Sequence, residues 1–172
     1  TSGNAVSDTV TVTTAAPFFR SSVAVNWNTA SNWQSSTDNV TWITSSSVPD
    51  SNATAITIRN GFNITNTGNI TADDITVDAG ATLTIAGGTF ALNNGAAATD
   101  LQVNGTLTYS GGTFTQNTSS GISFGASATY NHSISSATLN LPIATWNATS
   151  NCNVTGMNNN SPTDGINMGQ NF

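Results

Sequence analysis

Two segments of this chain have nearly the same sequence, with glycines at matching places: DITVDAGATLTIAGGTFALNNG at residues 74–95 and DLQVNGTLTYSGGTFTQN at residues 100–117. Each begins with a short run in which every second residue is apolar, a pattern typical of a strand with one buried face. Related runs begin at residues 55 and 121, so a unit recurs about every 20 residues. Such a unit can bury its apolar face only by stacking on its neighbours.

The leading strands of these units predict a ladder of inward side chains. The pairs are Ile56 and Ile58, Ile75 and Val77, Leu101 and Val103, Ile122 and Phe124, Leu139 and Leu141, and finally Cys152 and Val154. We expect Thr57, Thr76, Gln102 and Ser123 to stack on the outer face. Second strands are expected at 62–65, 82–85, 106–109 and 127–130, and third strands at 87–92 and 111–116. The sequence therefore predicts an all-β, right-handed parallel β-helix, or solenoid.

The main alternative fold is a β-sandwich, which is also built from short alternating strands. Asn-Gly pairs at 60–61, 94–95 and 104–105 are typical of the tight turns that join antiparallel strands. A sandwich does not require a repeated sequence, however, and the repeats favour the solenoid.

Three regions differ in their composition. Residues 1–17 predict one strand, over 9–13, followed by a linker, and residues 54–172 hold the coils, which we expect to continue beyond the chain end. Residues 18–53 contain Trp27, Trp33 and Trp42, whereas aromatic residues are sparse elsewhere. We expect this region to form a cap over the first coil. The alternative is a surface on which these three tryptophans stack against a glycan.

Charge is scarce in this chain. Its two basic residues are Arg20 and Arg59, its eight acidic residues are all Asp, and its net charge is −6. This balance argues against nucleic acid as a partner, because phosphates require basic side chains. It also argues against anionic membrane surfaces, and the sequence has no apolar run long enough to insert into a membrane. Cys152 is the one cysteine, so we expect a small buried residue and no intrachain disulfide.

Several segments resemble a module of large secreted surface proteins of Bacteroidota. They are VNWNTASNWQSSTDNVTWITSSSVPDSNATAITIRNGFNIT, DLQVNGTLTYSGG and ATYNHSISSATLNLPIATWNATSNCNVTGM, and the resemblance covers about residue 25 to residue 172. Phe62 departs from it, since a histidine is expected there. The resemblance implies a right-handed parallel β-helix within an exported, multidomain protein of the kind delivered by type IX secretion, such as a gliding adhesin. It implies no catalytic motif.

Few side chains in this sequence could take part in catalysis or bind a ligand. Asp74 and Asp100 hold equivalent positions in neighbouring coils and would be the carboxylates of a polysaccharide-cleaving site, but Asp at strand starts more often shapes a turn. His132 is the one histidine, and we expect it at a corner or partly buried. We predict no catalytic residue, no cofactor and no metal site. Asp8-Thr9-Val10 resembles an O-glycosylation sequon of Bacteroidota, with Thr9 as the acceptor.

Together these features predict a non-enzymatic structural or adhesive module of an extracellular protein or filament on a bacterial cell surface. Its expected partners are neighbouring domains or subunits, joined through coil ends and strand addition, and surface polysaccharide is a further candidate. The alternative function is a carbohydrate-binding or polysaccharide-cleaving β-helix.

Overall fold

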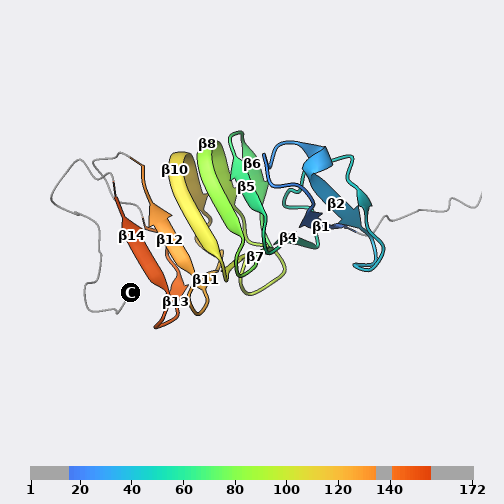
Figure 1. Ribbon diagram of the computed structural model, residues 1–172. Helices are drawn as coiled ribbons and strands as arrows, with labels where there is room; N and C mark the ends of the chain where they lie inside the picture. The colour runs from blue at the N-terminus through green and yellow to red at the C-terminus, as the bar shows by residue number, and fades with distance from the viewer. Residues whose placement is uncertain (1–15, 135–140, 156–172) are drawn as a thin grey trace, which may run out of the picture.

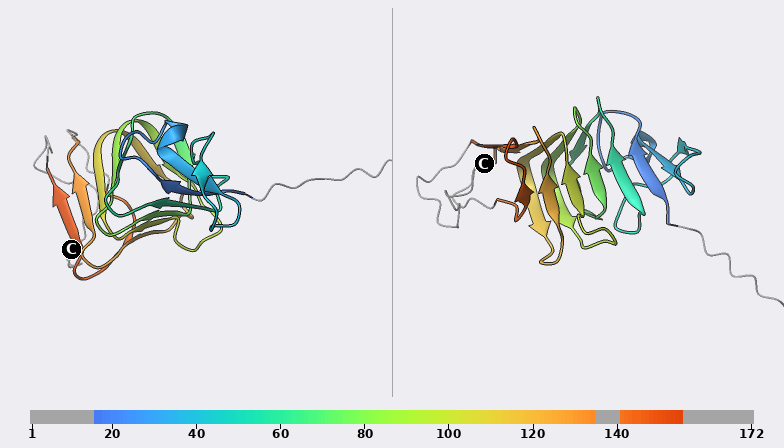
Figure 2. Two further views of the ribbon diagram at one scale, coloured as in Figure 1. Left: turned by 45° about the vertical axis from the view of Figure 1, so that its right-hand side comes forward. Right: turned by 90° about the horizontal axis from the view of Figure 1, so that it is seen from below.

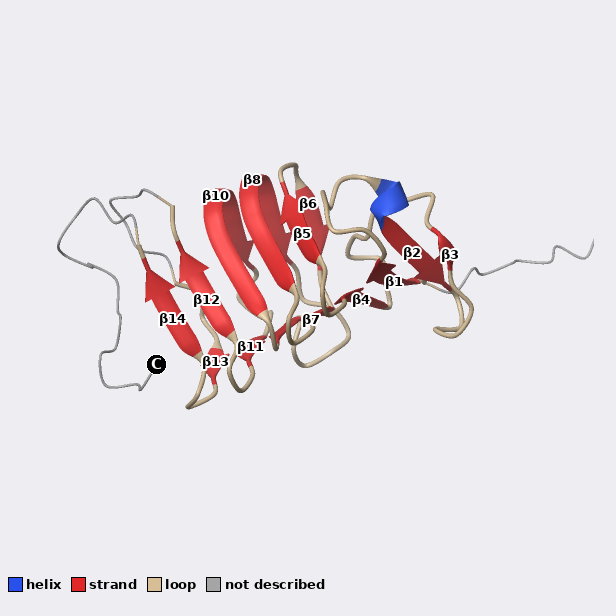
Figure 3. Ribbon diagram, in the orientation of Figure 1, coloured by secondary structure: helices blue, strands red, loops and turns tan. Residues whose placement is uncertain are grey.

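The computed structural model describes residues 16–134 and 141–155 and shows a stack of coils built from short strands (Figure 1). The first strands are β1 (Phe18–Ser21), β2 (Trp33–Ser36), β3 (Ile43–Thr44), β4 (Ala55–Ile58), β5 (Asn63–Asn66), β6 (Ile70–Ala72) and β7 (Ile75–Val77). They are followed by β8 (Thr82–Leu92), β9 (Leu101–Val103), β10 (Thr106–Gln116), β11 (Ile122–Phe124), β12 (Thr129–His132), β13 (Thr145–Trp146) and β14 (Asn151–Val154). The helical structure described is one 3₁₀ turn, Ala30–Asn32 (Figure 3).

The strands form two sheets that run along the stack, and the chain alternates between them. Sheet A has the order β13-β11-β9-β7-β4-β1-β2-β3, and sheet B has the order β14-β12-β10-β8-β5, with β6 also paired to β8. The views in Figure 2 show successive coils lying one behind another. Every pairing between coils is parallel, and the antiparallel pairings described are β1 with β2 and β2 with β3. The predicted parallel solenoid is therefore confirmed, and the sandwich is excluded.

The predicted inward ladder forms in sheet A. Ile56 pairs with Ile75, Ile75 with Leu101, and Leu101 with Ile122, and all four side chains are buried. Sheet B supplies the opposite wall with Ile64, Leu83, Leu107 and Tyr130 in one register. Burying each aliphatic side chain of this size contributes roughly 2 kcal/mol, so the continuous core holds the coils together.

The outward ladder of sheet A is confirmed as well. Thr57, Thr76, Gln102 and Ser123 are paired in that order, and Thr145 extends the series by one coil. We call these five residues the polar ladder. Like charges stacked at the spacing between strands, about 4.8 Å, would repel, and the ladder avoids this because all its side chains are neutral.

The prediction of separate second and third strands is wrong for two coils. β8 and β10 each run unbroken for 11 residues, with register irregularities near Gly111. The strands bend at Gly88 and Gly112, whose φ angles are 61° and 71°. These glycines stack: a Cβ on Gly112 would lie 2.5 Å from the carbonyl oxygen of Gly88, and one on Gly88 would overlap the backbone of Gly68. Glycine recurs here because neighbouring coils touch through their backbones.

The last coils are displaced from the predicted register. Ser123 and Phe124 pair with Thr145 and Trp146, so Trp146 takes the inward position predicted for Leu141, and its ring stacks on Phe124 with centroids 4.1 Å apart. Leu139 lies outside the described residues. β14 belongs to sheet B, where Cys152 pairs with Tyr130. The assignment of Cys152 and Val154 to a leading strand is therefore wrong.

Residues 18–53 lie at the other end of the stack (Figure 1). β1 pairs in parallel with β4, while β2 and β3 extend the sheet in antiparallel fashion. Trp27 and Trp33 are fully buried, with ring centroids 4.9 Å apart, and Trp27 also meets Phe90 edge-on at 5.4 Å. This region is thereby joined to the core of the coils, although β3 remains an edge strand within the described part of the chain.

Candidate functional site

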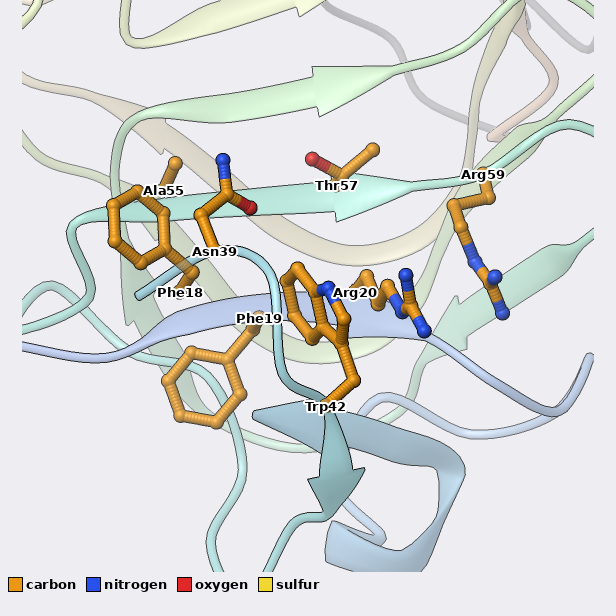
Figure 4. Close-up of a pocket in the computed structure, with 8 residues that line it drawn as sticks. All are labelled: Phe18, Phe19, Arg20, Asn39, Trp42, Ala55, Thr57 and Arg59. Atoms are coloured by element: carbon orange, nitrogen blue, oxygen red, sulfur yellow. The ribbon is translucent and has the colours of Figure 1, made fainter. Parts of the chain in front are cut away.

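A hollow of about 250 Å³ lies on the outer side of sheet A, where the β2–β3 hairpin meets β1 and β4 (Figure 4). Its principal side chains are Phe18, Arg20, Asn39, Trp42, Thr57 and Arg59. We call it the arginine hollow, because both basic residues of the 172-residue chain line it. In Figure 4, Trp42 and the two arginines occupy one end and Phe18 the other.

Strand register brings the two arginines together. Arg20 pairs with Thr57 across β1 and β4, and Arg59 follows directly after β4. The Nε of Arg20 donates to Oε1 of Gln34 at 2.8 Å, and the Nε of Arg59 donates to the carbonyl oxygen of Ser21 at 2.8 Å. Within the described residues the terminal Nη groups of both arginines donate no hydrogen bond. Each guanidinium fork is therefore fixed by the hydrogen bond of its Nε, and its two Nη groups are left open to a ligand.

The electrostatic surroundings of Arg59 are dominated by burial and by its neighbour. Burial lowers the pKa of Arg59, the charge of Arg20 lowers this pKa further, and the charge of Asp78 opposes both effects. The guanidinium stays protonated, because arginine does not lose its proton in proteins. No ion pair forms between described residues, so two like charges face the same hollow without a carboxylate in contact.

Trp42 lies in the loop that joins β2 to β3, and hydrogen bonds within this loop hold it in place. The Oδ1 of Asp38 accepts hydrogen bonds from the backbone N–H groups of Val40 at 2.8 Å and Thr41 at 2.7 Å, and from the hydroxyl of Ser36 at 2.7 Å. These hydrogen bonds hold the pKa of Asp38 below its usual range, and the bond from the Thr41 backbone has the largest effect. The Arg20 guanidinium lies 4.2 Å from the centroid of the half-buried Trp42 ring, a cation–π contact.

The structure separates the three tryptophans that the sequence grouped. The indole of Trp27 donates to the carbonyl oxygen of Pro49 at 3.1 Å, and that of Trp33 donates to the carbonyl oxygen of Trp27 at 2.9 Å. Since both rings are fully buried, the alternative in which Trp27 and Trp33 stack against a glycan at the surface is wrong. Trp42, in contrast, lines the arginine hollow.

Asp74 and Asp100 precede residues that pair across β7 and β9, as predicted, but their carboxylates contact backbone amides. The two oxygens of Asp100 accept from Gly95 at 2.5 Å and from Gly121 at 2.7 Å. Those of Asp74 accept from Ala97 at 3.1 Å and from Ala96 at 3.3 Å. The carboxylates thus shape the loop before β9, which supports the turn interpretation.

Asp73 belongs to the same corner and is 3% exposed. Burial raises its pKa to about 6, and the nearby carboxylates of Asp74, Asp100 and Asp50 add to this shift. Within the described residues no hydrogen bond reaches its carboxylate. Among those residues, no group of three or more His, Cys, Asp or Glu side chains is arranged to hold a metal ion.

His132 lies in β12 and is 1% exposed, so it is buried more completely than the sequence predicted. Its Nδ1 lies 3.1 Å from the hydroxyl of Tyr130, and its ring meets that of Tyr109 at 5.4 Å. Nε2 is buried and has no hydrogen-bond partner among the described residues. Burial lowers the pKa of His132.

Cys152 is half-buried, and burial raises the pKa of its thiol. Thr9 and the strand predicted over 9–13 lie outside the described residues.

Comparison with known proteins gives no match to a family model, to a curated protein or to a solved structure. Among the described residues, no helix has the length and apolar character needed to cross a membrane.

Sequence reasoning missed the arginine hollow. Arg20 and Arg59 lie on different predicted regions, and only the pairing of β1 with β4 makes them neighbours. The available signal was slight: Arg20 follows two apolar residues in FFRS at 18–21, and Arg59 ends the alternating run AITIR at 55–59.

Proposed function

We propose that this chain is a non-enzymatic structural module of an extracellular bacterial surface protein. The observation that carries the proposal is the unbroken parallel register of sheet A from β1 to β13, which makes the coils one continuous stack. Backbone hydrogen bonds and a shared core resist bending along such a stack. The neutral polar ladder supports the same role, because it gives a hydrated surface without strong charge. The resemblance to Bacteroidota surface proteins supports the location.

The test is electron microscopy of intact cells of the source organism, labelled with a gold-conjugated antibody raised against this chain. We expect gold on the cell surface or along fibres that leave it. Gold confined to the cell interior in sections, with none on intact cells, would contradict the proposal.

Carbohydrate binding is the second candidate function, and one observation favours it: an exposed hollow combines an aromatic ring with hydrogen-bonding side chains. Polysaccharide cleavage has less support, because the oxygens of Asp74 and Asp100 are engaged by backbone amides. Release of reducing ends from polysaccharide, abolished by Asp74→Asn and Asp100→Asn, would establish cleavage and overturn the non-enzymatic proposal.

A further inference from the structure

We infer that the arginine hollow binds a sugar that carries one carboxylate, such as a uronic acid at a chain end. This inference rests on carbohydrate binding, the second candidate function, and is independent of the structural role. It is carried by the two open guanidinium forks, the Trp42 ring and the neutral side chains that surround them.

The guanidinium groups select a carboxylate. The Nη groups of Arg20 and Arg59 donate to no protein atom in the described structure. Such groups bind planar oxyanions, often through two parallel hydrogen bonds. Two guanidiniums whose charges repel each other would both gain from an anion between them. Because the Nε atoms donate hydrogen bonds to Gln34 and Ser21, the two guanidinium groups are held in place before the ligand arrives.

The remainder of the hollow suits a sugar ring. Phe18, and the part of the half-buried Trp42 ring that the Arg20 guanidinium does not cover, offer apolar surface for the C–H faces of a pyranose. Asn39 and Thr57 offer hydrogen bonds to its hydroxyls. Thr57 is also the first residue of the polar ladder, so a neutral glycan attached to the bound sugar would meet Thr76 and Gln102 next.

The surroundings favour a single anionic group over a polyanion. Asp78 lies close enough to Arg59 to affect its pKa. Asp74 lines the adjacent hollow of about 400 Å³, which shares Ala55 with the first. A second carboxylate on a neighbouring sugar would meet these aspartates and a chain of net charge −6. Repulsion would then oppose what the arginines gain.

The test is NMR titration of the ¹⁵N-labelled chain at low ionic strength, where exposed charges are least screened. The probes are the Nε–H signals of Arg20 and Arg59, the only two arginines, and the indole N–H of Trp42. The buried indoles of Trp27 and Trp33 serve as controls within the same spectrum. The ligands are glucuronate, glucose and acetate.

We expect glucuronate to shift both arginine signals and the Trp42 indole along one saturating curve, with a Kd on the order of 1 mM. Trp27 and Trp33 should not move, and glucose and acetate should bind at least about tenfold more weakly. Arg59→Gln should weaken glucuronate binding about tenfold or more, and Arg59→Lys should restore only part of it. Thr84→Ala, on the outer side of sheet B, should leave binding unchanged.

Three outcomes would overturn the inference. If glucose binds as tightly as glucuronate, carbohydrate binding stands and the carboxylate specificity fails. If acetate matches glucuronate and Trp42 does not move, the hollow binds simple anions and the sugar plays no part. If no ligand gives a saturable shift while all four indole signals confirm a folded chain, both this inference and the carbohydrate-binding candidate fail, and the structural proposal is untouched.

Discussion

At the scale of single residues, two buried titratable groups make stability depend on pH in opposite directions. The fold holds His132 in its neutral form, because burial penalises the charged imidazole. The fold also penalises the charged form of Asp73, whose pKa is raised to about 6. Neither effect is visible in the sequence, since both arise from packing between coils.

The neutral His132 contributes stability above its unfolded pKa of 6.5, and this contribution is lost as the pH falls through the lower folded value. His132→Gln removes the titration and, at pH 7.5, should cost about 1–2 kcal/mol through lost packing. From pH 7.5 to pH 5 the wild type should lose stability relative to this variant. Urea denaturation at both pH values measures the difference. A gap that stays constant with pH would show that His132 does not titrate on unfolding.

Asp73 behaves in the opposite way. Its raised pKa means that stability is greatest when the carboxyl is protonated, below the ordinary value of 3.8, and is lost as the pH rises through about 6. Asp73→Asn should therefore stabilise the chain at pH 7.5, by about 1 kcal/mol. Two pKa units alone correspond to about 3 kcal/mol, but water reaches the neighbouring half-buried Asp74 and reduces the effect.

The same urea measurements at pH 4 provide the control for Asp73→Asn. The advantage of the variant should shrink there, because the wild-type carboxyl is protonated in the folded state. A destabilised variant at pH 7.5 would mean that the ionised carboxylate is favoured by contacts that outweigh its burial.

At the scale of elements, the strands predicted best are those whose alternation alone determines which face is buried. Ile75 and Leu101 could be aligned from sequence because each begins an alternating run after Asp. The same rule failed for Leu141 and Cys152, since alternation cannot tell sheet A from sheet B when loop lengths vary. It also missed Trp146, a single large residue that fills an inward position, because the other inward residue of that strand segment is the small Ala144.

The glycines of β8 and β10 stand at matching places in the sequence, but the match alone does not give the reason for them. Gly88 needs both a positive φ and close contact with the coil below, whereas Gly61 has a φ of 81° and would meet nothing within 4 Å. Gly61→Ala should cost about 1–2 kcal/mol for its backbone conformation alone. Gly88→Ala should cost about 3 kcal/mol or more, because the added methyl group displaces the backbone of Gly68.

Thermal unfolding of the two variants beside the wild type gives the comparison, with Gly61→Ala as the matched control. Equal losses of stability would show that backbone conformation accounts for both glycines and that contact between coils adds nothing.

At the scale of the whole molecule, interactions between charged side chains contribute little to holding the fold together. The composition shows that charged residues are scarce, and within the described residues no ion pair links the strands. The arginine hollow could not be predicted in the same way, because it depends on a long-range pairing between the first strand and the first coil. The fold could thus be predicted from the sequence, whereas the candidate site could not.

Stability should therefore be nearly independent of ionic strength. Between about 0.01 M and about 0.5 M NaCl, we expect the Tm to change by less than about 2 °C, because there are few charge pairs to screen. Differential scanning calorimetry of the whole chain provides the measurement. A fall of more than about 5 °C at high salt would reveal attractive electrostatic contributions larger than those of the contacts between the described residues.

The confinement of both arginines to one hollow has a consequence for proteolysis. An enzyme of trypsin's specificity requires lysine or arginine before the bond it cuts, and it would find two such bonds in 172 residues. Arg20 lies within β1, and Arg59 directly follows β4, so both bonds are held in or beside paired strands. The 113 residues after Arg59 offer this class of protease no cleavage site, folded or unfolded.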